Sequence, residues 1–176
     1  AIAARLYGIP WIADYQDLWS QSVMSTKSAP RREAERRLEA WALHAASAIT
    51  CCKDSFVPKL RKFTKEEKPI GVVPMAVDMR LWDDVPDQEP TEFKLAFVGN
   101  MYAGHITPDL LFAALRDLRE KSNPAGRDAT FHYYGHCGAI VRSAATRFGL
   151  EDIVFDHGLC SQRKTLEAER AAALLV

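Results

Sequence analysis

The chain has 176 residues, of which 48% are hydrophobic and 26% are charged, and its 23 basic and 23 acidic side chains give a formal net charge of zero. This composition is typical of a folded globular protein with one large or two small domains, and it favours neither nucleic acid nor an anionic membrane as the main partner. No apolar run approaches the ~20 residues that a membrane-spanning helix needs, and the four scattered cysteines are not a disulfide framework.

Two histidine–cysteine pairs raise the question of a metal site. His136 precedes Cys137, and His157 lies three residues before Cys160. Zinc accepts imidazole and thiolate ligands, but the chain has no Cys-x-x-Cys pair, and free cysteines are commonly small buried hydrophobes. We therefore expect no metal site.

Strand and helix patterns alternate in the first half of the chain. Strands are predicted at residues 10–15, 47–52 and 70–73, and helices at residues 1–7, 29–46 and 54–63. Gly8 is placed to close the first helix, and Pro58 falls in the first turn of the third, where proline is tolerated. Asp54 or Ser55 is the expected N-cap of that third helix. Pro74 lacks the N–H that a sheet ladder needs, so the third strand should end there.

The helix predicted at residues 29–46 is amphipathic. Its expected packed stripe, spaced as one helix face, is Ala34, Leu38, Trp41, Ala42 and Ala45. The other face includes the charged run "RREAERR". Two interpretations of this run stay open, a solvated helix face and a membrane-docking face, and the two glutamates among four arginines favour the first.

A linker pattern follows the third strand. The stretch "DDVPDQEPTEF" carries five acids and two prolines. Beyond it, strands are predicted at residues 93–99, 129–135, 152–158 and 174–176, and helices at residues 107–121, 138–149 and 161–173. Thr107 is the expected cap of the first of these helices, with Pro108 at its first position and Asp109 favoured by the helix dipole. Gly149 should close the second.

Strands that alternate with helices predict βαβ units and parallel sheets, and the acidic linker divides them into two sheets. The expected fold class is therefore α/β with two parallel sheets. The first residues fall inside a helix pattern, and Val176 falls on a strand pattern that belongs inside a sheet. We therefore expect an internal piece of a longer polypeptide, with a short protein with frayed ends as the alternative.

Ligands of open parallel sheets bind beyond the carboxyl ends of the strands. In the first half, the residues after these ends include Asp14, Asp17, Trp19, Pro74, Met75 and Asp78. In the second half they are residues 99–105, 135–138 and 158–161, and each strand is followed by a glycine (Gly99, Gly135 or Gly158). Glycine permits tight turns and close backbone approach, and the following helix N-termini favour an anion such as a phosphate. Glycines that only shape turns are the alternative, since no GxGxxG or GxxxxGK[ST] motif is present.

The order of the motifs carries a resemblance. The stretches "GIPWIADYQDLWS", "ASAITCC", "VVPMAVDMRLW", "KLAFVGNMYAGHITPDLLFAALRDL", "FHYYG" and "GLEDIVFDHG" occur in this order, with a charged helix after the first. This order resembles the retaining bacterial group 1 glycosyltransferases of the GT-B fold, in the branch that acts in capsule, O-antigen or exopolysaccharide synthesis. In that branch "G-x-x-Y" follows the first strand of the donor domain. The resemblance covers nearly the whole chain, and no single motif is diagnostic.

The resemblance implies two Rossmann-like domains that face each other across a cleft. Residues 1–75 would be the C-terminal half of the acceptor-binding domain, residues 76–91 the interdomain crossover and linker, and residues 92–176 the N-terminal half of the nucleotide-sugar donor domain. The implied donor-binding residues are Gly99, Asn100, Met101, Tyr102, His105, Gly135, His136, Gly158 and Leu159. The implied cleft or acceptor-side residues are Asp14, Asp17, Trp19, Pro74, Met75 and Asp78.

The chain departs from the family pattern in two places. The crossover, usually "PNGVD", is "PMAVD" at residues 74–78, and the first donor loop, "GNMYAGH", lacks the Arg and Lys that grip the diphosphate. The resemblance then implies that backbone N–H groups and His105 bind the diphosphate. The family's Glu-x7-Glu motif would lie after Val176 and its glycine-rich loop before Ala1. No catalytic residue is therefore assigned, and the piece alone is expected to be inactive.

Two functions stay open. The first is transfer of a sugar from a nucleotide-diphosphate donor to a carbohydrate or lipid-linked acceptor in cell-surface polysaccharide synthesis. It implies no cofactor besides the donor substrate, no nucleic-acid partner and a cytoplasmic location, with peripheral association at the inner face of the membrane as an open alternative. The second is a non-catalytic α/β binding or interaction domain, which the altered crossover and donor loop favour.

Overall fold

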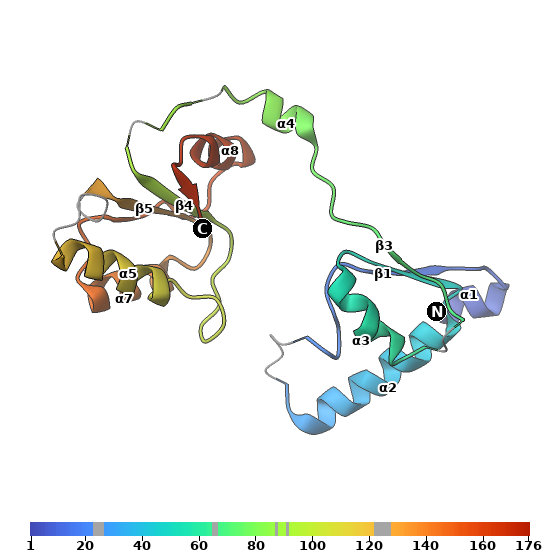
Figure 1. Ribbon diagram of the computed structural model, residues 1–176. Helices are drawn as coiled ribbons and strands as arrows, with labels where there is room; N and C mark the ends of the chain where they lie inside the picture. Colours follow the sequence, from blue (N-terminus) through green and yellow to red (C-terminus); the bar gives the residue numbers. More distant parts are fainter. Residues whose placement is uncertain (23–26, 65–66, 87, 91, 122–127) are drawn as a thin grey trace. The chain divides into compact units, whose positions relative to one another are not determined.

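A computed structural model of the chain describes residues 1–22, 27–64, 67–86, 88–90, 92–121 and 128–176 (Figure 1). The chain divides into two compact units, Ala1–Val77 and Asp78–Val176. Each unit has its own parallel sheet and its own hydrophobic core. The predicted α/β fold class with two parallel sheets is therefore confirmed.

In unit 1, the sheet has the order β1 (Ile12–Tyr15), β2 (Ala48–Cys51) and β3 (Ile70–Val72), and both pairings are parallel. The helical segments are α1 (Ile2–Tyr7), α2 (Ala29–Ala45), the short 3-10 helix η1 (Asp54–Phe56) and α3 (Val57–Arg61). The core joins α2 and α3 to the sheet through buried apolar side chains, which are Ala13, Leu18, Leu43, Ala46, Ile49, Cys51 and Leu60. Burial of these side chains is the main favourable contribution to the folding of this unit.

The packed face of α2 differs from the predicted one. The buried residues of this helix are Glu39 and Leu43, whereas Leu38 is 52% exposed and Trp41 is 42% exposed. The prediction was wrong because a hydrophobicity pattern counts Glu39 as a surface residue, although it lies on the packed face. Leu38 and Trp41 are large and apolar, so the pattern placed the packed face on their side of the helix.

The predicted helix ends are partly confirmed. Gly8 and Gly149 close α1 and α7 in the left-handed conformation, with φ of 64° and 66°. Pro58 lies in the first turn of α3, as expected. The predicted caps are wrong: neither η1 nor α3 has a side-chain cap, and α5 begins after Pro108, which occupies the N-cap position in place of Thr107. A residue type that can cap a helix does not fix its first residue, because helix ends vary by one or two positions.

In unit 2, the parallel sheet has the order β6 (Val154–Asp156), β5 (Thr130–Tyr134), β4 (Lys94–Val98) and β7 (Leu174–Leu175). The helices of this unit are α4 (Met79–Asp83), α5 (Asp109–Glu120), α7 (Gly138–Phe148) and α8 (Gln162–Arg170). Figure 1 shows α5 and α7 side by side, and their buried side chains join those of β4 and β5 in one core. Among the aromatic rings of this core, Phe112 meets Phe131 edge to face at 5.2 Å between centroids.

Helix α4 begins the second unit and is a feature that the sequence pattern missed. Asp78 caps it by accepting a hydrogen bond from the backbone N–H of Arg80 at 3.1 Å. The guanidinium of Arg170, on α8, lies 4.9 Å from the ring centroid of Trp82 and donates to the Trp82 carbonyl at 2.8 Å. These contacts attach α4 to the rest of unit 2.

Candidate functional site

The turns that follow β4, β5 and β6 are joined to one another at the carboxyl edge of the unit 2 sheet. The N–H of Gly99 donates to the carbonyl of Tyr134 at 2.9 Å, and the N–H of Gly135 donates to the carbonyl of Gly158 at 2.9 Å. The structure thus brings together the three glycine turns that the sequence singled out. A parallel sheet exposes its ligand-binding edge at this place.

Gly135 needs to be a glycine because of its neighbours. A Cβ atom there would overlap the carbonyl oxygen of Gly99 and the hydroxyl of Tyr133. Gly99 and Gly158 need to be glycines for their backbone conformation, since their φ values are 151° and 63°. The glycines therefore permit a close approach of three backbone segments.

The hydroxyl of Tyr133 holds two of these turns and was missed by the sequence analysis. It donates to the carbonyl of Gly99 at 3.0 Å and accepts from the N–H of Cys137 at 2.9 Å. Burial is the first cause that raises the pKa of this phenol above its ordinary value. The sequence offers one indication of this role: Tyr133 lies in a strand that is predicted to be buried, and a buried tyrosine hydroxyl usually has a hydrogen-bond partner.

Residues 100–106 form a small hairpin beside these turns. Tyr102 and Ile106 exchange backbone hydrogen bonds of 2.9 Å, and Gly104 supplies a φ of 78° between them. The side chains of Tyr102 and His105 are exposed, and Tyr102 is 47% accessible. Met101 is 3% exposed and packs in the core, so its side chain faces the interior of the unit.

A cavity of about 420 Å³ lies next to this hairpin. It is lined by the hairpin, the start of α5 and one side of α7, and its lining residues include Gly104, Thr107, Asp109, Ser143 and Arg147. Arg147 and Asp109 form an ion pair there. The cavity therefore offers both polar side chains and apolar surface beside the turns.

The remaining predicted donor-side residues are exposed at the same edge. Asn100 and His136 are exposed, and Leu159 is 67% accessible. Asp156, which the sequence analysis did not select, accepts from the N–H of Gly158 at 3.0 Å and pairs with Arg142. This carboxylate shapes the turn after β6.

Four stacked rings on β5, on β6 and just after β6 form a second feature that the sequence analysis missed. His157 stacks on Tyr134 at 4.5 Å and on His132 at 5.1 Å, and His132 stacks on Phe155 at 4.9 Å between centroids. The Nδ1 atom of His132 lies 2.9 Å from Nε2 of His157. Desolvation, with the nearby charge of Lys94, lowers the pKa of His132 from 6.5 to about 4. Their period-2 spacing on adjacent strands was the available signal.

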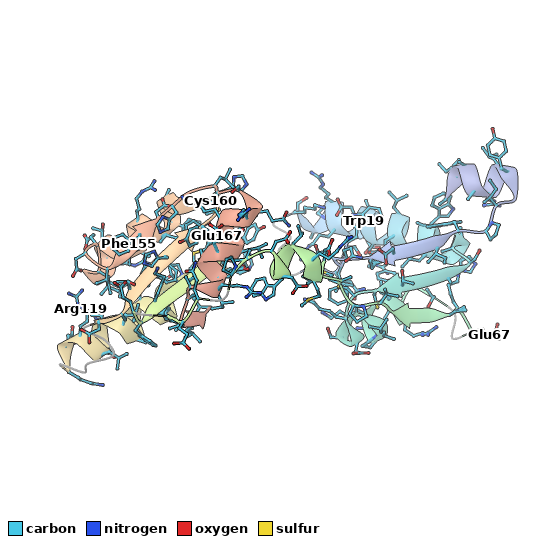
Figure 2. The ribbon with its side chains drawn as sticks, turned by 90° about the horizontal axis from the view of Figure 1, so that it is seen from above. Trp19, Glu67, Arg119, Phe155, Cys160 and Glu167 are labelled. Atoms are coloured by element: carbon cyan, nitrogen blue, oxygen red, sulfur yellow. The ribbon has the colours of Figure 1, made fainter. Side chains whose placement is uncertain are left out.

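In unit 1, three residues predicted at the carboxyl edge of the sheet lie at or just after the end of β1. Asp14 accepts hydrogen bonds from the Thr50 hydroxyl and from the Gln16 amide. Both bonds lower the pKa of its carboxyl, and the bond from Thr50 has the larger effect. Asp17 is exposed, and Trp19 is 38% accessible (Figure 2). Asp14 belongs to β1, and Asp17 and Trp19 belong to the short loop that follows this strand.

The residues predicted after β3 lie on both sides of the division between the units. Pro74 and Met75 belong to unit 1, and Met75 is 72% exposed. Val73 still donates to the carbonyl of Cys51 at 2.8 Å, so the ladder ends just before the proline, as predicted. Asp78 belongs to unit 2, where its contact with Arg80 lowers the pKa of its carboxyl.

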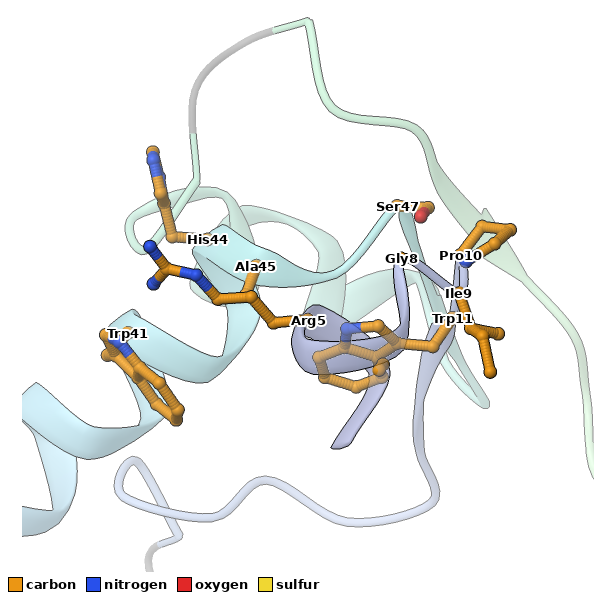
Figure 3. A pocket seen from close by; sticks show the side chains of 10 residues that line it. Arg5, Gly8, Ile9, Pro10, Trp11, Trp41, His44, Ala45 and Ser47 are labelled. Atoms are coloured by element: carbon orange, nitrogen blue, oxygen red, sulfur yellow. The ribbon is translucent and has the colours of Figure 1, made fainter. Parts of the chain in front are cut away.

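A larger pocket, of about 580 Å³, lies at the opposite edge of the unit 1 sheet. Its lining includes Arg5, Trp11, Trp41 and His44, and Figure 3 shows it beside α1 and the C-terminal half of α2. Residues 8–11 precede β1, so the pocket lies at the amino end of the strands. Open parallel sheets bind their ligands at the other edge, and we do not assign the site here.

Neither a metal cluster nor a bilayer span occurs in the part of the chain that the structure describes. Within these residues, no three His, Cys, Asp or Glu side chains come together as metal ligands. The described helices are all too short or too polar to cross a membrane.

Comparison with known proteins rests on structure, since no protein-family model matches the sequence and no curated protein is significantly similar to it. Sucrose-phosphate synthase from Thermosynechococcus elongatus matches with a TM-score of 0.71 and 15% identity, over 99% of this chain and 46% of that one. HepE from Anabaena, in complex with UDP and glucose, matches with a TM-score of 0.66 and 15% identity, over 99% and 47%. WaaG, a glycosyltransferase involved in lipopolysaccharide biosynthesis, matches with a TM-score of 0.62 and 16% identity, over 93% and 49%.

The chain spans about half the length of each of these three structures. At such identities the likeness concerns the fold, which agrees with the two parallel sheets described above. The chain therefore has the fold of the GT-B glycosyltransferases.

Proposed function

We propose that the protein carrying this chain is a glycosyltransferase, which moves a sugar from a nucleotide-diphosphate donor to a carbohydrate or lipid-linked acceptor in cell-surface polysaccharide synthesis. The observation that carries the proposal is the structural match of nearly the whole chain to GT-B enzymes, one of them in complex with UDP and glucose. The match to WaaG, an enzyme of lipopolysaccharide biosynthesis, supports the polysaccharide part of the proposal.

The donor would bind at the carboxyl edge of the unit 2 sheet. The proposed contacts are the backbone of Gly99, Met101, Gly135 and Gly158, together with Asn100, Tyr102, His105, His136 and Leu159. Residues 99–105 contain no Arg or Lys. The N–H groups of Gly99, Gly135 and Gly158 already donate within the turns. The N-terminus of α7 and His105 would therefore stabilise the charge that develops on the leaving diphosphate.

The acceptor would contact unit 1 through Asp14, Asp17 and Trp19, with Pro74, Met75 and Asp78 in the connecting segment. The arginines of α2 do not favour membrane docking, because Arg31, Arg36 and Arg37 form ion pairs with glutamates of the same helix. We propose a cytoplasmic enzyme that reaches lipid-linked acceptors through their sugar groups.

Calorimetric titration with UDP and with GDP tests the donor site. We expect binding of one nucleotide, and Tyr102→Ala and His105→Ala should weaken it because both side chains are exposed beside the turns. Leu110→Ala is the matched control, since this residue is 89% exposed on α5 and no role in binding is proposed for it. Absence of binding with both nucleotides would count against the proposal.

A non-catalytic binding domain is the second candidate, and the donor loop without a basic side chain favours it. The two candidates differ in turnover. A transferase releases a nucleoside diphosphate from a nucleotide sugar when acceptor glycans are present, whereas a binding domain leaves the donor intact.

A further inference from the structure

Glu39 is a buried charged residue on the packed face of α2. Its side chain is 0% exposed, and its Oε1 atom has no hydrogen-bond partner among the described protein atoms. A buried carboxylate with an unsatisfied oxygen is costly, and replacement of buried ionic groups by apolar ones of similar volume is often neutral or stabilising. Stability of the core therefore gives no reason for a glutamate at this position.

The partners of Glu39 lie at the two ends of one loop. Its Oε2 atom accepts the backbone N–H of Ser20 at 3.0 Å. At the other end, Tyr15 is the last residue of β1, and burial followed by the nearby charge of Glu39 raises the pKa of its phenol. The carboxylate thus holds the end of residues 15–20 by a hydrogen bond and lies near their beginning.

Other contacts hold the same loop against the core of unit 1. Leu18 is 8% exposed and belongs to the unit 1 core. Cys52 donates its N–H to the Tyr15 carbonyl at 3.2 Å and its Sγ–H to the Gln16 carbonyl at 3.0 Å. The loop therefore has a defined shape before any ligand arrives.

The side chains that this shape leaves exposed are those of Gln16, Asp17 and Trp19. An amide and a carboxylate exchange hydrogen bonds with hydroxyl groups, and an indole offers a flat apolar face with a polar N–H. Together they suit the hydroxyl-bearing edge and the apolar face of a pyranose ring. The loop also follows a strand at the edge where parallel sheets bind ligands.

We propose that Glu39 is a positioning residue, which holds residues 15–20 so that Asp17 and Trp19 recognise a sugar of the acceptor. This inference rests on the proposed glycosyltransferase function and adds a buried residue that does not touch the substrate. Its contribution comes from pre-organisation, since a loop that is ordered in advance loses less entropy when the acceptor binds.

Three variants of the whole protein that carries this chain test the proposal. Glu39→Leu removes both polar contacts and keeps a similar volume, and Glu39→Gln keeps an acceptor oxygen for the Ser20 N–H. Glu33→Gln is the matched control, because it removes the same charge from a partly exposed position of the same helix, where Glu33 pairs with Arg36 and Arg37.

Hydrogen exchange of the Ser20 amide is the first measurement. In Glu39→Leu we expect exchange to accelerate about 10- to 100-fold, since a hydrogen bond to a charged group is lost. The melting temperature should stay within about 5 °C of the parent or rise, because an apolar side chain replaces a buried charge. Glu39→Gln should restore most of the protection, and Glu33→Gln should match the parent.

The second measurement separates the acceptor from the donor. In Glu39→Leu the KM for the acceptor glycan should rise about tenfold or more while the KM for the nucleotide sugar stays unchanged, since a misplaced loop weakens only the contacts that it makes. A merely structural role would lower the melting temperature and change both constants together, and that result would overturn the proposal.

Failure of the positioning idea and failure of the proposed function give different results. Unchanged Ser20 exchange in Glu39→Leu overturns the positioning role whether or not the protein is an enzyme. Accelerated exchange in a protein that transfers sugar with unchanged acceptor KM overturns the recognition role. No turnover by the whole protein that carries this chain contradicts the proposed function and, with it, the acceptor role of the loop.

Discussion

Gly135 occupies a crowded backbone position at the carboxyl edge of the unit 2 sheet. Its N–H reaches Gly158, and its Cα faces the Gly99 carbonyl and the Tyr133 hydroxyl. The sequence shows a glycine after a strand, which is common in turns. Only the structure shows that three backbone segments meet there and that no larger residue fits.

Substitution of Gly135 by alanine should destabilise the protein. The added methyl group would overlap backbone and a buried hydroxyl, so we expect a loss of about 2–3 kcal/mol in the free energy of unfolding. Gly71→Ala is the control, because a Cβ there would meet only Thr50 Cγ2 at 4.0 Å. Urea denaturation checks both variants, and equal stabilities would contradict the close approach.

Tyr133 and Tyr134 differ in what their hydroxyl groups do. Tyr133→Phe leaves the Gly99 carbonyl and the Cys137 N–H without their partner and should cost about 1–3 kcal/mol. Tyr134→Phe removes a hydroxyl for which no hydrogen bond is recorded among the described residues, and it should change stability by less than about 0.5 kcal/mol. Denaturant unfolding of the two variants compares their stabilities, provided that the free energy of unfolding depends on denaturant concentration with the same slope in both. A larger loss in Tyr134→Phe than in Tyr133→Phe would contradict this prediction.

At the scale of elements, α2 shows how a helix can present two apolar stripes and pack only one. Leu43 is 1% exposed, while Leu38 is 52% exposed. Leu43→Ala should therefore lower the free energy of unfolding by about 2–4 kcal/mol, and Leu38→Ala by less than about 1 kcal/mol. Chemical denaturation measures both variants. A larger loss of stability in Leu38→Ala than in Leu43→Ala would support the packed face that the sequence pattern predicted.

The ring stack on β5 and β6 makes the stability of unit 2 depend on pH. The pKa of His132 is lowered from 6.5 to about 4, so the folded state favours neutral imidazole and the unfolded state binds more protons between these values. The stabilising effect is complete above pH 6.5 and is lost as the pH falls towards 4. We expect a loss on the order of 1 kcal/mol after allowance for solvent screening at this half-exposed ring.

Thermal unfolding of the parent and of His132→Gln between pH 7 and 4 measures this effect. The stability of the variant should depend less steeply on pH, because the contribution of His132 is absent. Some dependence should remain, because burial also lowers the pKa of the neighbouring His157. Parallel curves for the two proteins would show that the stack does not titrate in this range.

At the scale of the whole molecule, the chain passes between its two units through an exposed segment. Val73, Met75 and Val77 are 56%, 72% and 74% exposed, and the first unit ends at Val77 while the second begins at Asp78. The contacts of Arg170 with Trp82 attach α4 to the second unit. The exposed connection therefore ends where α4 begins.

Limited proteolysis with thermolysin, which prefers apolar residues, should cut first within residues 73–77 and release two stable fragments. Trp82→Ala should extend the susceptible region into α4, because the ring under Arg170 is lost. Mass spectrometry of the first fragments identifies the sites. First cleavage inside either sheet would contradict the division into two units.

The sequence alone predicted the larger features of this protein. Alternating strands and helices, the strand that ends before Pro74, and Gly8 and Gly149 as helix ends are local patterns, and each depends on residues that are neighbours along the chain. The glycines after β4, β5 and β6 were found for the same reason, since a strand end and a turn residue are adjacent in sequence.

Tertiary structure decided the rest. The packed face of α2, the hydroxyl of Tyr133 between two turns and the carboxylate of Glu39 between Tyr15 and Ser20 depend on which distant segments meet. A buried polar side chain looks like a surface residue in a hydrophobicity pattern, because the pattern does not contain the partners that satisfy it. The sequence therefore determines where the chain turns, and only packing determines which polar groups those turns bring together.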